Sequence, residues 1–228
     1  MMQLRVAEER GKANFGWLDA RHSFSFGHYY DPQWMGHSVL RVINQDQVAP
    51  GGGFATHPHA NMEILTYVLS GTIAHKDSLG HAEQIPAGEF QLMSAGSGIR
   101  HSEYNPSQTD PLSLLQIWIE PSEFGTPPGY QQQKIAARPG MTLVASPDGE
   151  AGSLVIRQQA RIWRLELAPG ETIEWALAGH HGYLQLISGE LTANDLVVRP
   201  GDGVLSRDQS RWHLLATHAS EALLFDLP

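Results

Sequence analysis

Short runs of β-branched, leucine and aromatic residues most constrain the fold of this 228-residue chain. The clearest of these runs span residues 39–43, 64–69, 114–119, 161–167 and 183–187. They are bounded by Gly, Pro, Asn, Asp or Ser, which is typical of strands joined by tight turns. The chain holds 23 Gly and 14 Pro, and it has no long amphipathic helical pattern. The sequence therefore predicts an all-β protein.

The second half of the chain resembles a diverged copy of the first half. Residues 186–191 (Leu-Ile-Ser-Gly-Glu-Leu) parallel residues 68–73 (Val-Leu-Ser-Gly-Thr-Ile), and a proline–glycine turn recurs at 85–88 and 199–203. Internal repetition of this kind indicates repeated structural units that stack on one another. The sequence therefore predicts two stacked β domains.

The composition also suggests where these two domains meet. We expect a first domain at residues 1–125 and a second at residues 141–228. The segment 126–140 is rich in Pro, Gln and Gly and has little hydrophobic periodicity. Such segments commonly connect domains, so we predict that it is a linker.

Two short clusters of metal-ligand residue types stand about forty residues apart. They are His57-Pro58-His59 and His101-Ser102-Glu103. In a strand, residues i and i+2 lie on the same face, so each cluster could present a pair of ligands inward. An ordinary solvated role is the alternative, since the chain holds 12 histidines. Two such pairs together favour a site with three imidazoles and one carboxylate.

The spacing of these residues resembles the two sequence motifs of the cupin superfamily. The motifs read His57-x-His59-x-x-x-Glu63, then Gly71, and Pro86-x-Gly88, then His101-x-x-x-Asn105. The flanking sequence is most similar to pirin, and especially to bacterial pirin-like proteins with quercetin 2,3-dioxygenase activity. The stretches that carry this likeness are 16–26, 29–32, 56–59 and 94–103.

The resemblance implies a bicupin, in which two antiparallel β-barrel or jelly-roll domains stack. It also implies four metal ligands, which fall on His57, His59, His101 and Glu103. In many cupins the glutamate of the first motif is a ligand too. We expect Glu63 instead to be a structural group or a hydrogen-bond partner of a ligand, because ligating histidines need such partners.

The resemblance further implies a dioxygenase that opens the ring of a flavonol such as quercetin with dioxygen. In that activity Glu103 would be both a ligand and the base that takes the proton of the 3-hydroxyl group. The alternative is a metal-dependent regulatory protein that acts through a protein partner, as eukaryotic pirins do.

Three imidazoles and one carboxylate suit a single divalent ion that keeps open coordination positions. Iron, copper, nickel, manganese and zinc all accept these ligands, and we favour Fe(II). A closed structural zinc site is less favoured, because such sites often use cysteine. The chain contains no cysteine.

The repeat predicts that the second domain lacks a metal. Aligned on its proline–glycine and serine–glycine turns, it carries Trp175 and Leu177 in place of the first two histidines. His213 then aligns with His101, and Leu215 aligns with Glu103. One histidine is too few ligands to hold an ion.

The charge balance excludes some partners. With 15 Lys and Arg against 24 Asp and Glu, the net charge is −9. This argues against direct nucleic-acid binding, which requires basic residues to neutralise phosphates, and against docking on anionic lipid. No signal peptide or run of about 18 apolar residues is present, so we expect a cytoplasmic protein without membrane association.

An N-terminal stretch rich in aromatic residues and histidines is harder to interpret. Its members are Trp17, His22, Phe24, Phe26, His28, Tyr29, Tyr30, Trp34 and His37. Most of the aromatic side chains are expected to pack in the core or between domains. A few aromatic residues and any of these histidines could instead line a pocket for an aromatic substrate.

Overall fold

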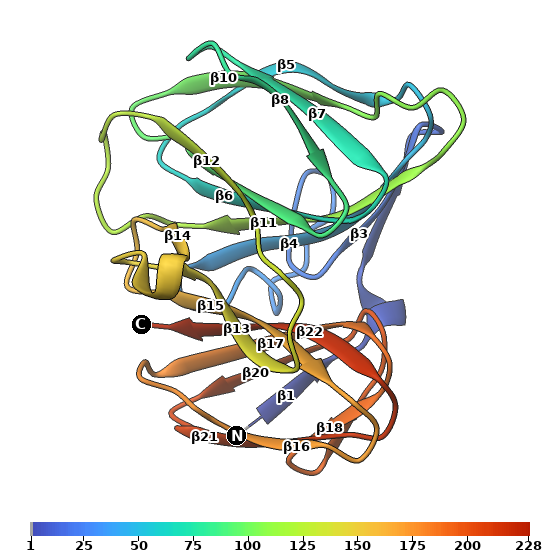
Figure 1. Ribbon diagram of the computed structural model, residues 1–228, viewed down its shortest axis with the longest axis vertical. Coiled ribbons are helices and arrows are strands. Elements are labelled where there is room, and N and C mark those ends of the chain that lie inside the picture. The colour runs from blue at the N-terminus through green and yellow to red at the C-terminus, as the bar shows by residue number, and fades with distance from the viewer. Residues whose placement is uncertain (1) are drawn as a thin grey trace.

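The computed structural model describes residues 2–228 and consists of four stacked β-sheets (Figure 1). Two seven-stranded sheets lie in the middle, and a four-stranded sheet covers the outer face of each. Each seven-stranded sheet and its four-stranded partner enclose one barrel. The predicted all-β fold with two stacked cupin barrels is confirmed.

The first barrel contains most strands of the N-terminal half. Its seven-stranded sheet has the order β12 (Gly129–Lys134), β9 (Glu89–Ser94), β6 (Glu63–Ser70), β11 (Leu112–Ile119), β4 (Leu40–Val48), β3 (Leu18–His22) and β2 (Gly11–Asn14). Its four-stranded sheet has the order β5 (Gly53–His59), β10 (Ile99–Tyr104), β7 (Thr72–Asp77) and β8 (Ala82–Pro86).

The second barrel repeats this arrangement. Its seven-stranded sheet has the order β1 (Met2–Arg5), β20 (Gly203–Arg207), β17 (His181–Ser188), β22 (Ser220–Leu227), β15 (Arg161–Leu167), β13 (Gly140–Ser146) and β14 (Leu154–Val155). Its four-stranded sheet has the order β16 (Thr172–Ala176), β21 (Arg211–Ala216), β18 (Leu191–Ala193) and β19 (Leu196–Val198). Two short 3-10 helices, η1 (Ala7–Glu9) and η2 (Glu150–Gly152), lie in connections.

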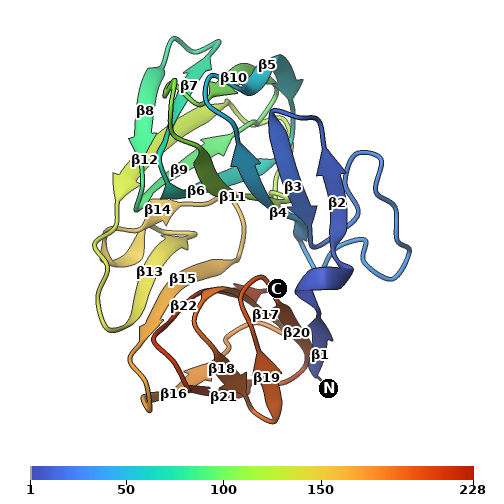
Figure 2. The same cartoon turned by 90° about the vertical axis from the view of Figure 1, so that its right-hand side faces the viewer.

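Two strands belong to sheets that could not be expected from their place in the sequence. Strand β1 pairs with β20 in the second barrel, and the chain then crosses through η1 to β2 in the first (Figure 2). Strand β12 lies within the segment predicted to be a linker, and it pairs with β9 at the edge of the first barrel. The glutamine-rich composition of that segment therefore conceals an edge strand.

Strand alternation separates two buried environments in the first barrel. On β11, Leu115, Ile117 and Ile119 belong to the apolar core between the two seven-stranded sheets. Between them, Gln116 and Trp118 face the barrel interior and line its cavity. Because successive side chains point to opposite faces, one strand supplies both the domain contact and the wall of the cavity.

The second barrel is filled by apolar side chains. Trp175 of β16 lies opposite Trp212 of β21, and their ring centroids are 5.2 Å apart. Both indoles are buried in a cluster with leucines from both sheets, including Leu214. The predicted alignment of His213 with His101 is wrong by one residue. His213 is exposed, and Trp212 occupies the inward position, because a shift of one residue changes the face.

Candidate metal centre and its pocket

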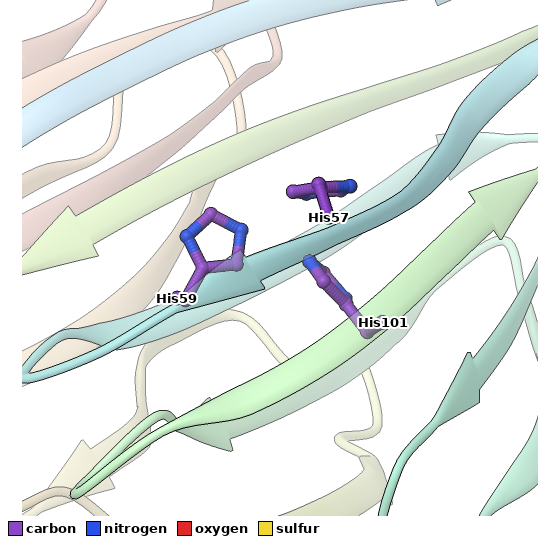
Figure 3. Close-up of side chains that lie close together, drawn as sticks. All are labelled: His57, His59 and His101. Carbon is purple, nitrogen blue, oxygen red and sulfur yellow. The ribbon is translucent and has the colours of Figure 1, made fainter.

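Paired strands β5 and β10 bring the three predicted histidines together. His57 lies directly opposite His101, and His59 follows His57 on the same face of β5. The ring centroids of His57 and His101 are 4.5 Å apart, and that of His59 lies 4.8 Å from His57 and 4.9 Å from His101. Figure 3 shows the three side chains close together on β5 and β10. One ring nitrogen from each lies within 4.8 Å of the others.

Glu103 lies deeper in the barrel than the three histidines. The pairing of β10 with β5 shifts register after His101, so that Glu103 faces Phe54 on one side and His75 of β7 on the other. Ligand atoms of His75, His101 and Glu103 lie within 4.8 Å of one another. His101 therefore belongs to both groups. It is the residue that links Glu103 to His57 and His59.

Burial keeps His59 and His101 in the neutral form that binds metals. Desolvation, and secondly the neighbouring His57, lower the pKa of His59 to about 4. The same two causes, with smaller contributions from His59 and His75, lower the pKa of His101 to about 3. A neutral imidazole offers a lone pair to a metal ion, and a protonated imidazolium does not. The low pKa values of the two rings therefore suit coordination.

The carboxyl group of Glu103 is buried and held by two amides. Burial raises its pKa to about 7, although two hydrogen bonds to the carboxylate act in the opposite direction. Gln116 donates from Nε2 to Oε2 across 3.0 Å, and Gln91 donates from Nε2 to Oε1 across 3.4 Å. Glu103 can therefore exchange a proton near neutral pH in the metal-free protein.

The donor set fits a metal ion. Both ring nitrogens of His101 are buried without a hydrogen-bond partner among the described residues, which is costly unless another group satisfies them. Nδ1 of His57 donates a hydrogen bond to the backbone carbonyl of Ala55, at 2.7 Å, which leaves Nε2 free to bind a metal ion. Such a backbone contact also fixes the orientation of a ligating ring.

Glu63 lies away from this group and bridges the two barrels. Its Oε2 accepts hydrogen bonds from Ser94 Oγ at 2.9 Å and from the backbone N–H of Arg157 at 3.2 Å. Strand β5 ends at His59 and β6 begins at Glu63, with Asn61 in a left-handed turn between them. Inward alternation does not continue across that turn, which explains why Glu63 leaves the site.

A cavity of about 900 Å³ opens onto His57 and His59 from between the two sheets of the first barrel. Its walls are largely aromatic and include Phe15, Trp17, Phe26, Phe54 and Trp118. Of the N-terminal histidines, His22 and His28 line the cavity. His37 is instead buried, and its Nε2 forms a 3.0 Å hydrogen bond with the backbone carbonyl of Ser206 in the second barrel. Tyr30 is exposed, and Phe24 and Trp34 belong to the core between the sheets.

Sequence reasoning missed several polar groups around the cavity. Asn44, Asp46 and Gln116 sit at inward positions of strands whose apolar runs drew attention instead. Their signal was a polar residue at an inward position of an apolar strand. His75 carried a signal that was not used, since His75 and Asp77 form an i, i+2 pair of the same kind as His101 and Glu103.

Comparison with known proteins agrees with this site. The pirin family matches residues 3–119, and a family described as the quercetinase C-terminal cupin domain matches residues 143–227. The chain belongs to the pirin family. This pirin is 51% identical to a quercetin 2,3-dioxygenase of Escherichia coli over 229 residues, which cover 100% of this chain and 99% of the relative. It is 38% identical to the pirin-like protein YhaK of E. coli, with full coverage of both chains.

A crystal structure of the bacterial pirin YhhW from E. coli, in complex with nickel(II), has nearly the same fold. It superposes on this pirin with a TM-score of 0.98 at 51% identity, covering 100% of this chain and 99% of that one. Nickel is thus a metal that such a relative accepts. No helix among residues 2–228 of this pirin is long and apolar enough to cross a membrane.

Proposed function

We propose that this pirin is a metal-dependent dioxygenase that opens the ring of a flavonol such as quercetin with dioxygen. The observation that carries the proposal is the group of three converging histidines at an aromatic cavity of about 900 Å³. Full-length similarity to a quercetin 2,3-dioxygenase supports it. Ring opening would add both oxygen atoms of dioxygen to the substrate and release carbon monoxide.

His57, His59, His101 and Glu103 would hold one divalent ion, and Fe(II) is the ion we favour. When bound, such an ion supplies Lewis-acid and redox chemistry toward a flavonol and dioxygen. The neutral state of His59 and His101 means that no proton has to leave them before coordination at pH 7.

Glu103 would also take the proton of the flavonol 3-hydroxyl group. Burial raises the pKa of Glu103 to about 7 in the metal-free protein, and a bound cation would lower it again, so the carboxylate would be charged and able to accept the proton. The amides of Gln91 and Gln116 orient the carboxyl oxygens and stabilise the charged form. Aromatic walls such as Trp118 would hold a flat substrate and exclude water from the reacting centre.

The test is flavonol-dependent oxygen uptake by metal-depleted protein reloaded with Fe(II), nickel, copper, manganese or zinc in turn. We expect uptake and carbon monoxide release with quercetin, and loss of both when metal is removed. Absence of uptake with every one of these ions would overturn the enzymatic proposal and favour a regulatory protein that acts through a partner.

The decisive variant is Glu103→Gln, which keeps the shape of the side chain and removes the base. At matched metal occupancy we expect turnover to fall by about 10²-fold or more, the usual contribution of a positioned proton-transfer group. Glu123→Gln is the control, since Glu123 is exposed outside the cavity. Equal turnover in Glu103→Gln and wild type would remove the base role and leave the metal site standing.

A further inference from the structure

A band of polar side chains crosses the inner wall of the first barrel. Backbone pairing aligns His22 with Asn44, Asn44 with Gln116, Gln116 with Thr66, and Thr66 with Gln91. All five residues are buried. Gln116 and Gln91 contact Glu103, so this band marks the level of the reacting centre along the barrel.

The next inward row is apolar except for one residue. It contains Ala20, Leu114 and Val68, and Asp46 stands between Ala20 and Leu114. Ala20, Leu114 and Val68 belong to one apolar cluster with Leu18. A carboxyl group in this position loses the hydration it would have in water, and its neighbours offer no compensation.

Asp46 has an unsatisfied oxygen beside the cavity. The residue is 2% exposed, and its Oδ1 has no hydrogen-bond partner among residues 2–228. Asp46 nevertheless lines the cavity that opens onto His57 and His59. Burial, and secondly the Glu103 carboxylate, raise the pKa of Asp46 to about 7, and no cation is among the causes of this shift. The unpaired oxygen at the cavity wall leaves a place for a polar group that enters through the cavity. A hydroxyl group can pair with either protonation state of the carboxyl group, because it donates and accepts hydrogen bonds.

The geometry points to Asp46 as the residue that accepts a hydrogen bond from a second hydroxyl group of the substrate, distinct from the 3-hydroxyl that reacts. Asp46 follows Asn44 by two residues on β4, which places it roughly 7 Å along the strand from the polar band. That separation is comparable with one hydroxylated aromatic ring. Asp46 would thus select polyhydroxylated flavonols over those that carry the 3-hydroxyl alone.

This inference rests on the proposed function, so its test measures binding without turnover. Metal-loaded protein is titrated without oxygen with quercetin and with 3-hydroxyflavone, which has no other hydroxyl group. In Asp46→Leu we expect affinity for quercetin to fall about 5- to 100-fold, the usual cost of leaving a buried hydroxyl group of the ligand without its partner. Affinity for 3-hydroxyflavone should change by less than about threefold, since that ligand has nothing to donate to Asp46.

Two further variants separate hydrogen bonding from a change in cavity shape. Asp46→Asn keeps a carbonyl acceptor, so its affinity for quercetin should lie between those of wild type and Asp46→Leu. Leu18→Ala removes an apolar wall residue of the same cluster, so it should lower the affinity for quercetin and for 3-hydroxyflavone alike. Galangin, which keeps the fused-ring hydroxyls and lacks those of the pendant ring, then identifies the ring that Asp46 contacts.

Stability provides an independent readout. Removing a buried, unpartnered carboxyl group should leave the ligand-free Asp46→Leu protein at least as stable as wild type. A marked drop in its melting temperature, together with equal loss of both ligands, would assign Asp46 a structural role and overturn the inference. Equal affinity of wild type and Asp46→Leu for quercetin would overturn it as well.

Failure of the proposed function gives a different result. If both flavonols bind with the expected selectivity and no ion supports oxygen uptake, the inference stands as a binding site and the dioxygenase proposal falls. If neither flavonol binds the metal-loaded protein, both fall together.

Discussion

Nε2 of His75 lies 3.1 Å from Oδ2 of Asp77, and both side chains are fully buried behind the candidate metal centre. Asp77 also accepts a hydrogen bond from Nδ1 of His81, whose side chain is partly exposed. Burial raises the pKa of Asp77, but the hydrogen bonds from His75 and His81 outweigh it, so the net shift is downward and Asp77 stays charged. A fixed carboxylate thus orients His75, which stands next to His101 and Glu103.

Asp77→Asn should weaken metal binding without touching a proposed ligand. The amide no longer fixes which nitrogen of His75 carries the proton, so the packing behind His101 loosens. Hydrogen bonds to a ligating residue are typically worth about 10- to 100-fold in metal affinity. Asp77 acts one step further from the metal, through His75, so we expect a loss of up to about 10-fold. Competition with a chelator measures the change. His81→Ala is the control, because it leaves the contact between His75 and Asp77 intact; an equal loss in both variants would contradict the prediction.

His57→Ala should lose most of the bound metal while the fold survives. The ring supplies one of three converging ligands, and the barrel keeps its apolar clusters without it. Elemental analysis of gently purified protein and thermal unfolding measure the two effects. His213→Ala should retain the one equivalent that we expect per chain, since His213 is exposed on the second barrel. Full occupancy in His57→Ala would remove His57 from the ligand set.

Trp175→Ala should destabilise the protein strongly and leave metal binding unchanged. Trp175 is 2% exposed and packs against Trp212 in the filled second barrel. Truncating such a side chain leaves a cavity and costs about 3–5 kcal/mol of unfolding free energy. Denaturant titration and metal analysis of the folded protein give the two readouts. A normal stability combined with reduced metal content would show that the second barrel takes part in the site.

His37 predicts acid sensitivity of the contact between the barrels. Burial, and secondly His181, lower its pKa from 6.5 to about 4. Between these values the unfolded chain binds a proton that the folded protein rejects. His37 therefore contributes its full stability above pH 6.5, and this contribution is lost as the pH falls toward 4, by about 3 kcal/mol in the limit.

The test compares the pH dependence of unfolding in metal-free wild type and His37→Gln. The slope of the unfolding free energy against pH reports how many protons are taken up on unfolding. Between pH 6.5 and pH 4 this number should be lower in the variant by up to about one proton. His180→Gln is the control, because the His180 side chain is 78% exposed. Coincident slopes in wild type and His37→Gln would contradict the assignment.

Local patterns predicted the strands and the histidine group because both depend on alternation within a strand. His57 and His59 lie on one strand, and His101 lies opposite on its neighbour. The same reasoning failed where register is set elsewhere. His213 was displaced by one residue because the length of the preceding turn could not be deduced from a diverged repeat. Glu63 follows a turn and is the structural group that was expected.

Other features depend on long-range pairing that composition conceals. The run Gln131-Gln132-Gln133 reads as a linker, yet it forms an edge strand whose side chains help to hold it in place. Gln131 exchanges two hydrogen bonds with the backbone of Val155, each 2.9 Å long. Gln132 donates from Nε2 to Glu89 across 2.8 Å. These partners come from distant parts of the chain, so no local pattern could reveal them.

The crossing of the chain between barrels also orders its assembly. Strand β1 pairs with β20, about two hundred residues later in the sequence, so β1 is synthesised long before its partner. Until β20 is made, residues 2–5 have no partner in their own sheet. A C-terminal fragment made alone would have the opposite defect, an open edge at β20 that can pair with other chains. The two halves are therefore expected to fold as one molecule and to be poor candidates for separate expression.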